Sequence, residues 1–291
     1  MRLDELPKSQ RVEDRRGMTA GRAGGMGIGT VVVLCLIGWG LGIDPSVLIG
    51  GASQLSGGSQ TQQQQAPTGA PSDEMGHFVS AVLGSTEEVW TGVFAQAGKK
   101  YTPPTLVMFS GATQSGCGFA QSAMGPFYCP MDQKVYLDTS FFQDLERRFG
   151  ACDIGSKTCQ FAQAYVIAHE IGHHVQNQLG LLPQVQEAQR AMAQAEANGL
   201  QVRVELQADC LAGVWANRAQ AKWQFIEPGD VEAAMQTASA IGDDRLQRQA
   251  QGYVVPDSFT HGTSAQRTQW FMTGLKSGDV ASCDTFQSQE R

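Results

Sequence analysis

The apolar run at residues 161–176 carries a polar group at its centre, in the order His169-Glu170-Ile171-Gly172-His173. A buried ionised carboxylate or imidazole without a partner is costly, so something in the fold must compensate these side chains. On a helix, His169 and His173 project from one face, where two imidazole nitrogens can meet one metal ion. Glu170 is rotated by about 100° around the axis and can reach a metal-bound water without being a ligand. The sequence therefore predicts a divalent metal site, with zinc (Zn2+) as the metal.

A catalytic zinc site needs a third protein ligand and an open position. Glu205 and Asp209 are four residues apart in a second predicted helix, 202–219, so their carboxylates point the same way. We expect Glu205 to complete the ligand set and Asp209 to accept the other ring N–H of a ligand histidine. The alternative for His169 and His173 is a pair of histidines that form hydrogen bonds in the core. The alternative for Glu205 and Asp209 is an acidic helix face exposed to solvent. His174 and His77 have no comparable partners and are predicted to be ordinary polar residues.

A long uncharged segment near the start of the chain predicts attachment to a membrane. The chain has no charged residue between Arg22 and Asp44, and a helix needs about 20 apolar residues to cross a bilayer. Because arginines and lysines precede the segment, the positive-inside rule predicts a cytoplasmic tail at 1–24 and a single-pass signal anchor at 25–43 in the cytoplasmic (inner) membrane. The rest of the chain would then be extracytoplasmic. A signal peptide cleaved near 50–52 and a buried helix are the alternatives.

Composition divides the remainder into a linker and a domain. Residues 44–72 are rich in Gly, Ser and Gln, have almost nothing to bury and are predicted to be a flexible linker. Residues 73–291 have the composition of one folded domain. The net charge of −7 provides no basic surface of the kind that nucleic-acid binding requires, so a nucleic-acid partner is not expected.

Cysteine usage agrees with an exported domain. Six of the seven cysteines lie outside the predicted anchor, and an even number in an oxidising compartment is typical of disulfide bonds, although many pairings are possible. Closeness along the chain suggests Cys117 with Cys129 and Cys152 with Cys159, which leaves Cys210 for Cys283. The alternative is a set of free thiols in the core.

Hydrophobic periodicity and turn residues predict an α+β domain, mostly helical with a small sheet. The predicted strands, 105–110 and 134–138, are separated by a loop that the first disulfide would close. The predicted helices are 78–97, 141–149, 159–179 (with Thr158 as N-cap and Gly180 after its end), 184–197, 202–219, one after Asp230, and one through Leu275 that a capping box at 263–266 opens.

With these motifs in view, the chain resembles the bacterial membrane-anchored neutral zinc metallopeptidases over nearly its whole length, apart from the linker. The residues that carry the resemblance are Arg2-Leu3-Asp4, Ser115-Gly116-Cys117-Gly118, Gly125-Pro126-Phe127-Tyr128-Cys129-Pro130, His169-Glu170-Ile171-Gly172-His173-His174-Val175-Gln176, Glu205-Leu206-Gln207-Ala208-Asp209-Cys210 and His261-Gly262-Thr263-Ser264-Ala265-Gln266-Arg267. The resemblance implies a zincin-type fold, with Glu205 as the third zinc ligand. The segment with Cys152 and Cys159 is not typical of that family.

Two functions from different classes fit these residues. The first is a zinc-dependent peptidase that cleaves a protein or peptide substrate outside the cytoplasm, with Glu170 activating the zinc-bound water. His261 is a candidate for stabilising the carbonyl oxygen as it gains charge, Arg267 is the competing donor, and an exposed loop histidine without a role is the alternative. The second function is a non-catalytic zinc-stabilised module that binds envelope proteins or peptidoglycan. A Glu170→Gln variant separates the two functions.

Overall fold

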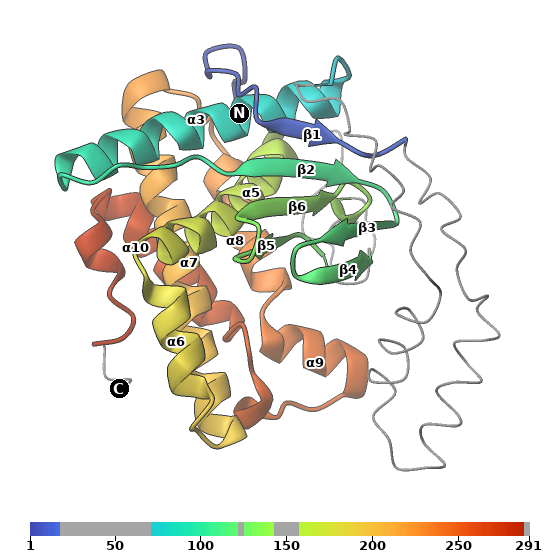
Figure 1. Cartoon of the computed structure of the whole chain (residues 1–291), viewed down its shortest axis with the longest axis vertical. Coiled ribbons are helices and arrows are strands. Elements are labelled where there is room, and N and C mark those ends of the chain that lie inside the picture. Colours follow the sequence, from blue (N-terminus) through green and yellow to red (C-terminus); the bar gives the residue numbers. More distant parts are fainter. Residues whose placement is uncertain (18–70, 122–124, 143–156, 288–291) are drawn as a thin grey trace, which may run out of the picture. The chain divides into compact units, whose positions relative to one another are not determined.

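The computed structural model of the chain describes residues 1–17, 71–121, 125–142 and 157–287. Met1–Gly17 and Pro67–Arg291 belong to one compact unit. Helices predominate in the described part of this unit and a small sheet accompanies them, which confirms the predicted α+β class. Figure 1 shows α3 along the β1 side of the sheet, with the N-terminal segment in blue beside it.

The sheet has four strands in the order β1-β2-β6-β5. Strand β1 (Val12–Asp14) is parallel to β2 (Thr105–Phe109), and β2 is parallel to β6 (Lys134–Asp138), whereas β5 (Phe127–Cys129) is antiparallel to β6. The central strands β2 and β6 are buried along most of their length, as is typical of strands covered on both faces. Strand β5 is at one end of the strand order, and it lies against helix α5 (Lys157–Gln178).

The region between the two predicted strands is more ordered than the sequence suggests. It contains the hairpin of β3 (Ala112–Ser115) and β4 (Gly118–Gln121), followed by β5. A disulfide joins Cys117 at the hairpin turn to Cys129 of β5, with an S–S distance of 2.05 Å, which confirms the predicted pair. Cys152 lies outside the described residues, as does the predicted helix 141–149 beyond residue 142, so neither prediction is tested.

The other α-helices of the described residues are α3 (Glu74–Gln96), α6 (Leu181–Gln189), α7 (Gln194–Trp223), α8 (Asp230–Ala240), α9 (Asp243–Gln251) and α10 (Ser264–Ser277). The predicted helix 184–197 is helical at both ends but not continuous, because α6 ends at Gln189 and α7 begins at Gln194. A polar, Ala/Gln-rich stretch has no apolar period to reveal this break. Helix α5 begins at Lys157, so Thr158 is not its N-cap. The capping box of Thr263 and Gln266 is present as predicted.

Small residues set how closely the site-bearing helices pack. A Cβ added to Gly172 of α5 would lie 3.0 Å from the Cα and the carbonyl oxygen of Ala208 in α7. On the other side of α7, a Cβ on Gly274 of α10 would overlap the carbonyl oxygen of Cys210. Helix α7 is thus held between α5 and α10 at backbone-contact distance, and this closeness places its carboxylates against the histidines of α5.

The N-terminal segment differs from the predicted division into a tail at 1–24 and a domain at 73–291. Leu6 and Val12 are buried, and the backbone N–H of Ser9 donates to the carbonyl oxygen of Ser80 in α3 at 3.0 Å. Because β1 pairs with β2, residues 1–17 belong to the same folded unit as the domain. A three-residue strand is too short for hydrophobic alternation to reveal it.

Among the helices that the structure describes, none combines the length and the hydropathy that crossing a bilayer requires. The predicted anchor at 25–43 and nearly all of the predicted linker at 44–72 lie outside the described residues.

Candidate metal centre

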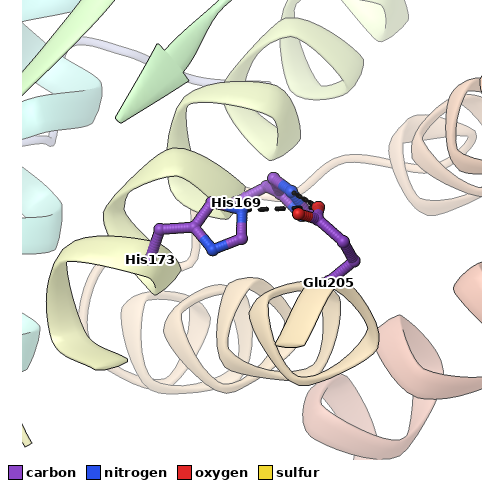
Figure 2. A group of neighbouring side chains, drawn as sticks. All are labelled: His169, His173 and Glu205. Atoms are coloured by element: carbon purple, nitrogen blue, oxygen red, sulfur yellow. Dashed lines mark hydrogen bonds and ion pairs between the residues drawn. The ribbon is translucent and has the colours of Figure 1, made fainter. Parts of the chain in front are cut away.

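Two helices bring three potential metal ligands together. Figure 2 shows His169 and His173 on α5 pointing toward Glu205 of α7. Oε2 of Glu205 lies 3.1 Å from Nε2 of His169 and 3.4 Å from Nε2 of His173. One ligand atom from each of the three side chains lies within 4.8 Å of the others. The structure therefore brings together the three residues that the sequence spacing selected.

The geometry of this cluster fits zinc. With zinc–nitrogen and zinc–oxygen bonds of about 2.0–2.1 Å, two ligand atoms of a tetrahedral site lie about 3.3 Å apart. Both distances to Glu205 are close to this value. Two imidazole nitrogens and one carboxylate oxygen are a donor set of catalytic zinc sites, which keep a fourth position open. The side chains fit the ion in kind, and the two distances to Glu205 fit it in spacing.

Asp209 holds the first of the two histidines in place. Its Oδ1 lies 2.8 Å from Nδ1 of His169, and the carboxylate is fully buried. A carboxylate can only accept, so Nδ1 carries a hydrogen and Nε2 is the nitrogen that can bind a metal. The same oxygen accepts from the hydroxyl of Tyr165 at 2.6 Å. Asp209 thus has the position expected from the sequence, and Tyr165 is a partner that the sequence did not indicate.

The charges in this cluster are strongly coupled. Burial lowers the pKa of His169, but Asp209 and Glu205 raise it by more, to about 10. Burial raises the pKa of Glu205, but His173 and His169 outweigh burial and hold this pKa well below its usual range. Without a cation, the cluster therefore keeps a proton on an imidazole beside the carboxylates. Binding of a divalent ion must displace this proton, because only the neutral imidazole is a ligand.

Glu170 is placed next to the ligands. It is 7% exposed and lines the same cavity as His169, His173 and Glu205. Burial raises the pKa of its carboxyl group, and the two neighbouring histidines oppose the shift without cancelling it. A carboxylate with a raised pKa is a better proton acceptor near neutral pH than an exposed one. The position of Glu170 suits a general base.

The cavity in front of the cluster has a volume of about 460 Å³. Apolar side chains form much of its wall, among them Phe127, Phe141, Val166, Leu182, Val185 and Leu246. Strand β5, at the end of the strand order, borders it through Phe127 and Tyr128. The cluster therefore faces a space that can take apolar parts of a ligand.

His261 also lines this cavity, and its side chain is half exposed. Its Nδ1 lies 3.2 Å from Oδ1 of Asp243, a residue that the sequence did not single out. Oδ2 of Asp243 accepts from the backbone N–H groups of Thr260, His261 and Gly262 at 2.7, 2.6 and 3.1 Å. Burial raises the pKa of Asp243, but the side chain of His261 and the backbone N–H groups of His261 and Thr260 outweigh burial and lower this pKa below its usual value. Asp243 therefore fixes the loop that carries His261.

Arg267 is the competing candidate for stabilising charge on a substrate, but its guanidinium already donates hydrogen bonds to protein groups. It is 3% exposed, and its guanidinium donates to Asp209, to the carbonyl oxygen of Ile241 and to the hydroxyl of Tyr165. Both side chains line the cavity, but His261 is the more exposed of the two and has, among the described residues, no other charge to neutralise than that of Asp243.

His174 is not the ordinary polar residue that the sequence predicted. It is fully buried, its Nδ1 lies 3.0 Å from the hydroxyl of Tyr128, and its Nε2 lies 2.8 Å from the carbonyl oxygen of Thr102. Burial lowers its pKa to about 4. His174 thus ties α5 to β5, and the long sequence separation of its partners explains why no local pattern revealed it. His77 is exposed, as expected.

Comparisons with known proteins give one family. A sequence model of the family described as "Putative neutral zinc metallopeptidase" matches residues 1–286. The Escherichia coli (strain K12) protein named "Uncharacterized protein YpfJ" is 46% identical over 297 residues, covering 98% of this chain and 99% of that protein. "Uncharacterized protein Rv2575" of Mycobacterium tuberculosis (strain H37Rv) is 43% identical over 221 residues, covering 73% of this chain and 71% of that protein. No solved structure matches the chain, so the zincin-type fold stays a prediction.

Proposed function

The chain belongs to the neutral zinc metallopeptidase family, and from this premise we propose that it is a zinc-dependent peptidase that cleaves peptide bonds in the cavity beside His169, His173 and Glu205. The family implies zinc as the cofactor and a peptide or protein as the substrate. The observation that carries the proposal is the position of Glu170, a buried carboxyl group that borders the cavity beside the three ligands.

His169, His173 and Glu205 would hold the zinc ion, which supplies a Lewis acid and lowers the pKa of its bound water toward about 7. Glu170 accepts a proton from the attacking water, whose oxygen forms a bond to the carbonyl carbon of the substrate. Glu170 then returns this proton to the amine nitrogen as the C–N bond breaks. In its imidazolium form, with Nδ1 held by Asp243, His261 would donate a hydrogen bond from Nε2 to the carbonyl oxygen while this oxygen carries negative charge.

The cavity suggests how a peptide would lie. Strand β5 has a partner only on its β6 side in the described sheet, and it borders the cavity. The free side of an edge strand can pair with an extended peptide through main-chain hydrogen bonds. A substrate held in this way would place one side chain against the apolar wall and its carbonyl group near the ligands.

A Glu170→Gln variant tests the proposal most directly. It should bind zinc as the parent protein does and lose hydrolysis of a peptide library, because the amide cannot accept the proton. The parent protein should lose the same activity in a chelator and recover it when zinc is added. No cleavage by the zinc-loaded parent, or equal cleavage by the variant, would contradict a peptidase and favour the non-catalytic zinc-stabilised module.

We also propose that the site faces the extracytoplasmic side of the membrane, with attachment through residues 25–43. The disulfides Cys117–Cys129 and Cys210–Cys283 support this side, because such bonds persist in oxidising compartments. A single crossing between residues 17 and 71 would separate β1 from β2. The proposal therefore replaces the single-pass anchor expected from the sequence with an attachment that makes no net crossing, and it places residues 1–17 on the same side as the site instead of in the cytoplasm.

Labelling of intact cells tests this topology. Cysteines introduced at the exposed positions Asp4 and Glu196 should both react with a membrane-impermeant maleimide. Reaction at Glu196 alone would restore the cytoplasmic tail, and reaction at neither position before lysis would place the whole folded unit inside.

A further inference from the structure

The second ring nitrogen of the metal ligand His173 is held by an amide rather than by a carboxylate. Its Nδ1 lies 2.9 Å from Oε1 of Gln176, one turn further along α5. Gln176 is fully buried. An amide can present either its oxygen or its nitrogen to a ring, so the orientation of Gln176 decides which nitrogen of His173 carries the hydrogen.

Hydrogen bonds on the far side of Gln176 set that orientation. Its Nε2 donates to the backbone carbonyl oxygen of Val204 at 2.8 Å, and a carbonyl oxygen can only accept. The Oε1 atom must then face His173 and accept its Nδ1 hydrogen. His173 is left with a lone pair on Nε2, the atom that points toward Glu205.

A second glutamine extends this chain of hydrogen bonds. Nε2 of Gln176 also donates to Oε1 of Gln207 at 3.0 Å, and Nε2 of Gln207 donates to the carbonyl oxygen of Cys283 at 3.0 Å. This acceptor is again a backbone carbonyl, so the orientation of Gln207 is set in the same way. Both amides are thus oriented by backbone groups outside the metal site.

The last acceptor of this series of hydrogen bonds, Cys283, is held covalently. Cys283 forms a disulfide with Cys210, the neighbour of Asp209 on α7. The hydroxyl of Thr285 donates to the carbonyl oxygen of Arg203 at 2.7 Å, which also holds this segment against α7. The carbonyl group of Cys283 is therefore fixed relative to the helix that carries Glu205.

We propose that Gln176 and Gln207 are positioning residues that fix the tautomer and the ring orientation of His173 as a metal ligand. The Cys210–Cys283 disulfide holds the backbone carbonyl group that orients Gln207. His169 is oriented by a buried carboxylate and His173 by two amides. Partners of this kind are worth about 10–100-fold in metal affinity.

Zinc affinity, measured by competition with a chelator in the full-length protein, tests the proposal without reference to peptidase activity. Gln176→Leu should weaken zinc binding by about 10–100-fold. Gln207→Leu should weaken it less, because the bond from Gln176 to Val204 remains. Gln163→Leu is the matched control, since Gln163 is a buried glutamine on the same helix whose amide lies near Cys159 rather than near a ligand.

Cobalt substitution adds a reading that general destabilisation would not produce. The visible spectrum of bound Co²⁺ reports the geometry of its ligands, so it should shift in Gln176→Leu and Gln207→Leu and stay unchanged in Gln163→Leu. If Gln176→Leu does not fold, the Gln207→Leu variant tests the proposal by itself, because Gln207 is partly exposed and its replacement is tolerated more easily. Parental affinity and an unchanged cobalt spectrum in the glutamine variants would overturn the proposal, as would an equal loss in Gln163→Leu.

Discussion

Arg267 donates two hydrogen bonds to the carboxylate of Asp209, from Nε to Oδ2 at 2.9 Å and from Nη2 to Oδ1 at 3.0 Å. Both side chains are buried. Burial raises the pKa of Asp209, but Arg267 and His169 outweigh it and hold the pKa at about 2. The carboxyl group therefore stays ionised at neutral pH and can orient His169. One buried ion pair thus links α10 to the metal site on α5 and α7.

Asp209→Asn should weaken both zinc binding and the fold. An amide accepts less strongly than a carboxylate and can turn its NH₂ group toward His169, so we expect a loss of about 10–100-fold in zinc affinity. Arg267 would keep a buried charge without its counter-ion, at a cost of about 3–5 kcal/mol in unfolding free energy. Chelator competition and urea unfolding measure the two effects. Glu196→Gln, an exposed position on the same helix, is the control; unchanged zinc affinity in Asp209→Asn would contradict the role of the carboxylate.

Gly172→Ala should push α5 and α7 apart. The added Cβ would lie 3.0 Å from backbone atoms of Ala208, so the helices must shift, and we expect a loss of about 1–3 kcal/mol in stability together with weaker zinc binding. Gly92→Ala in α3 is the matched control, because a Cβ there meets nothing within 4 Å. That variant should gain about 0.5–1 kcal/mol from helix propensity. Equal unfolding midpoints for the two variants would refute the close contact.

Removal of the Cys210–Cys283 disulfide should affect the metal site, whereas removal of Cys117–Cys129 should not. The sequence separations are 73 and 12 residues, which correspond to about 4 and about 3 kcal/mol of stability by loop-closure entropy. Only the first bond holds the carbonyl group that Gln207 contacts. The double Cys→Ser variant of Cys210–Cys283 should therefore bind zinc more weakly and be less stable than the double Cys→Ser variant of Cys117–Cys129. The expectation fails if both variants bind zinc alike.

Features of the site that depend on neighbours along the chain could be predicted from the sequence. His169 and His173 share a helix face because they are four residues apart, and the same spacing aligns Glu205 with Asp209. Thr263 and Gln266 form their capping box within one turn. In each case the local periodicity of a helix contains the information.

Features that depend on contacts between distant segments could not be predicted. Asp243 and His261 are 18 residues apart, and His174 meets Tyr128 across 46 residues. The strand β1 has only three residues, and its pairing with β2 depends on the whole sheet. The number of residues that could face one another across a fold is too large for spacing to select the pairs, so these contacts require the structure.

Acid should weaken the attachment of the N-terminal segment to α3. Arg16 bridges Asp14 of β1 at 2.8 Å and Asp73, the N-cap of α3, at 2.7 Å. Its hydrogen bonds lower the pKa of both carboxyl groups below their usual value of 3.8. A depressed carboxyl pKa contributes stability that is complete above the unfolded-state pKa and is lost as the pH falls through the folded-state pKa.

Arg16→Gln should therefore be less stable than the parent at pH 7, and this difference should shrink below about pH 4. Urea unfolding of the metal-free proteins measures it without a contribution from zinc release. Arg11→Gln is the control, because Arg11 is more exposed and lies 3.9 Å from its partner Glu87. A stability difference between Arg16→Gln and the parent that stays constant from pH 7 to pH 3 would exclude the carboxylates as its source.

His261→Ala should lower turnover without removing zinc. The side chain borders the cavity, Asp243 holds its loop and its Nδ1, and the ligand cluster is complete without it. A preorganised donor to the substrate oxygen acts mainly in the transition state, so we expect kcat to fall by about 10²-fold with little change in KM. His77→Ala, at an exposed histidine of α3, should have parental kinetics. Loss of zinc from His261→Ala would make His261 a ligand instead, and parental turnover at full zinc occupancy would leave the substrate oxygen to the metal alone.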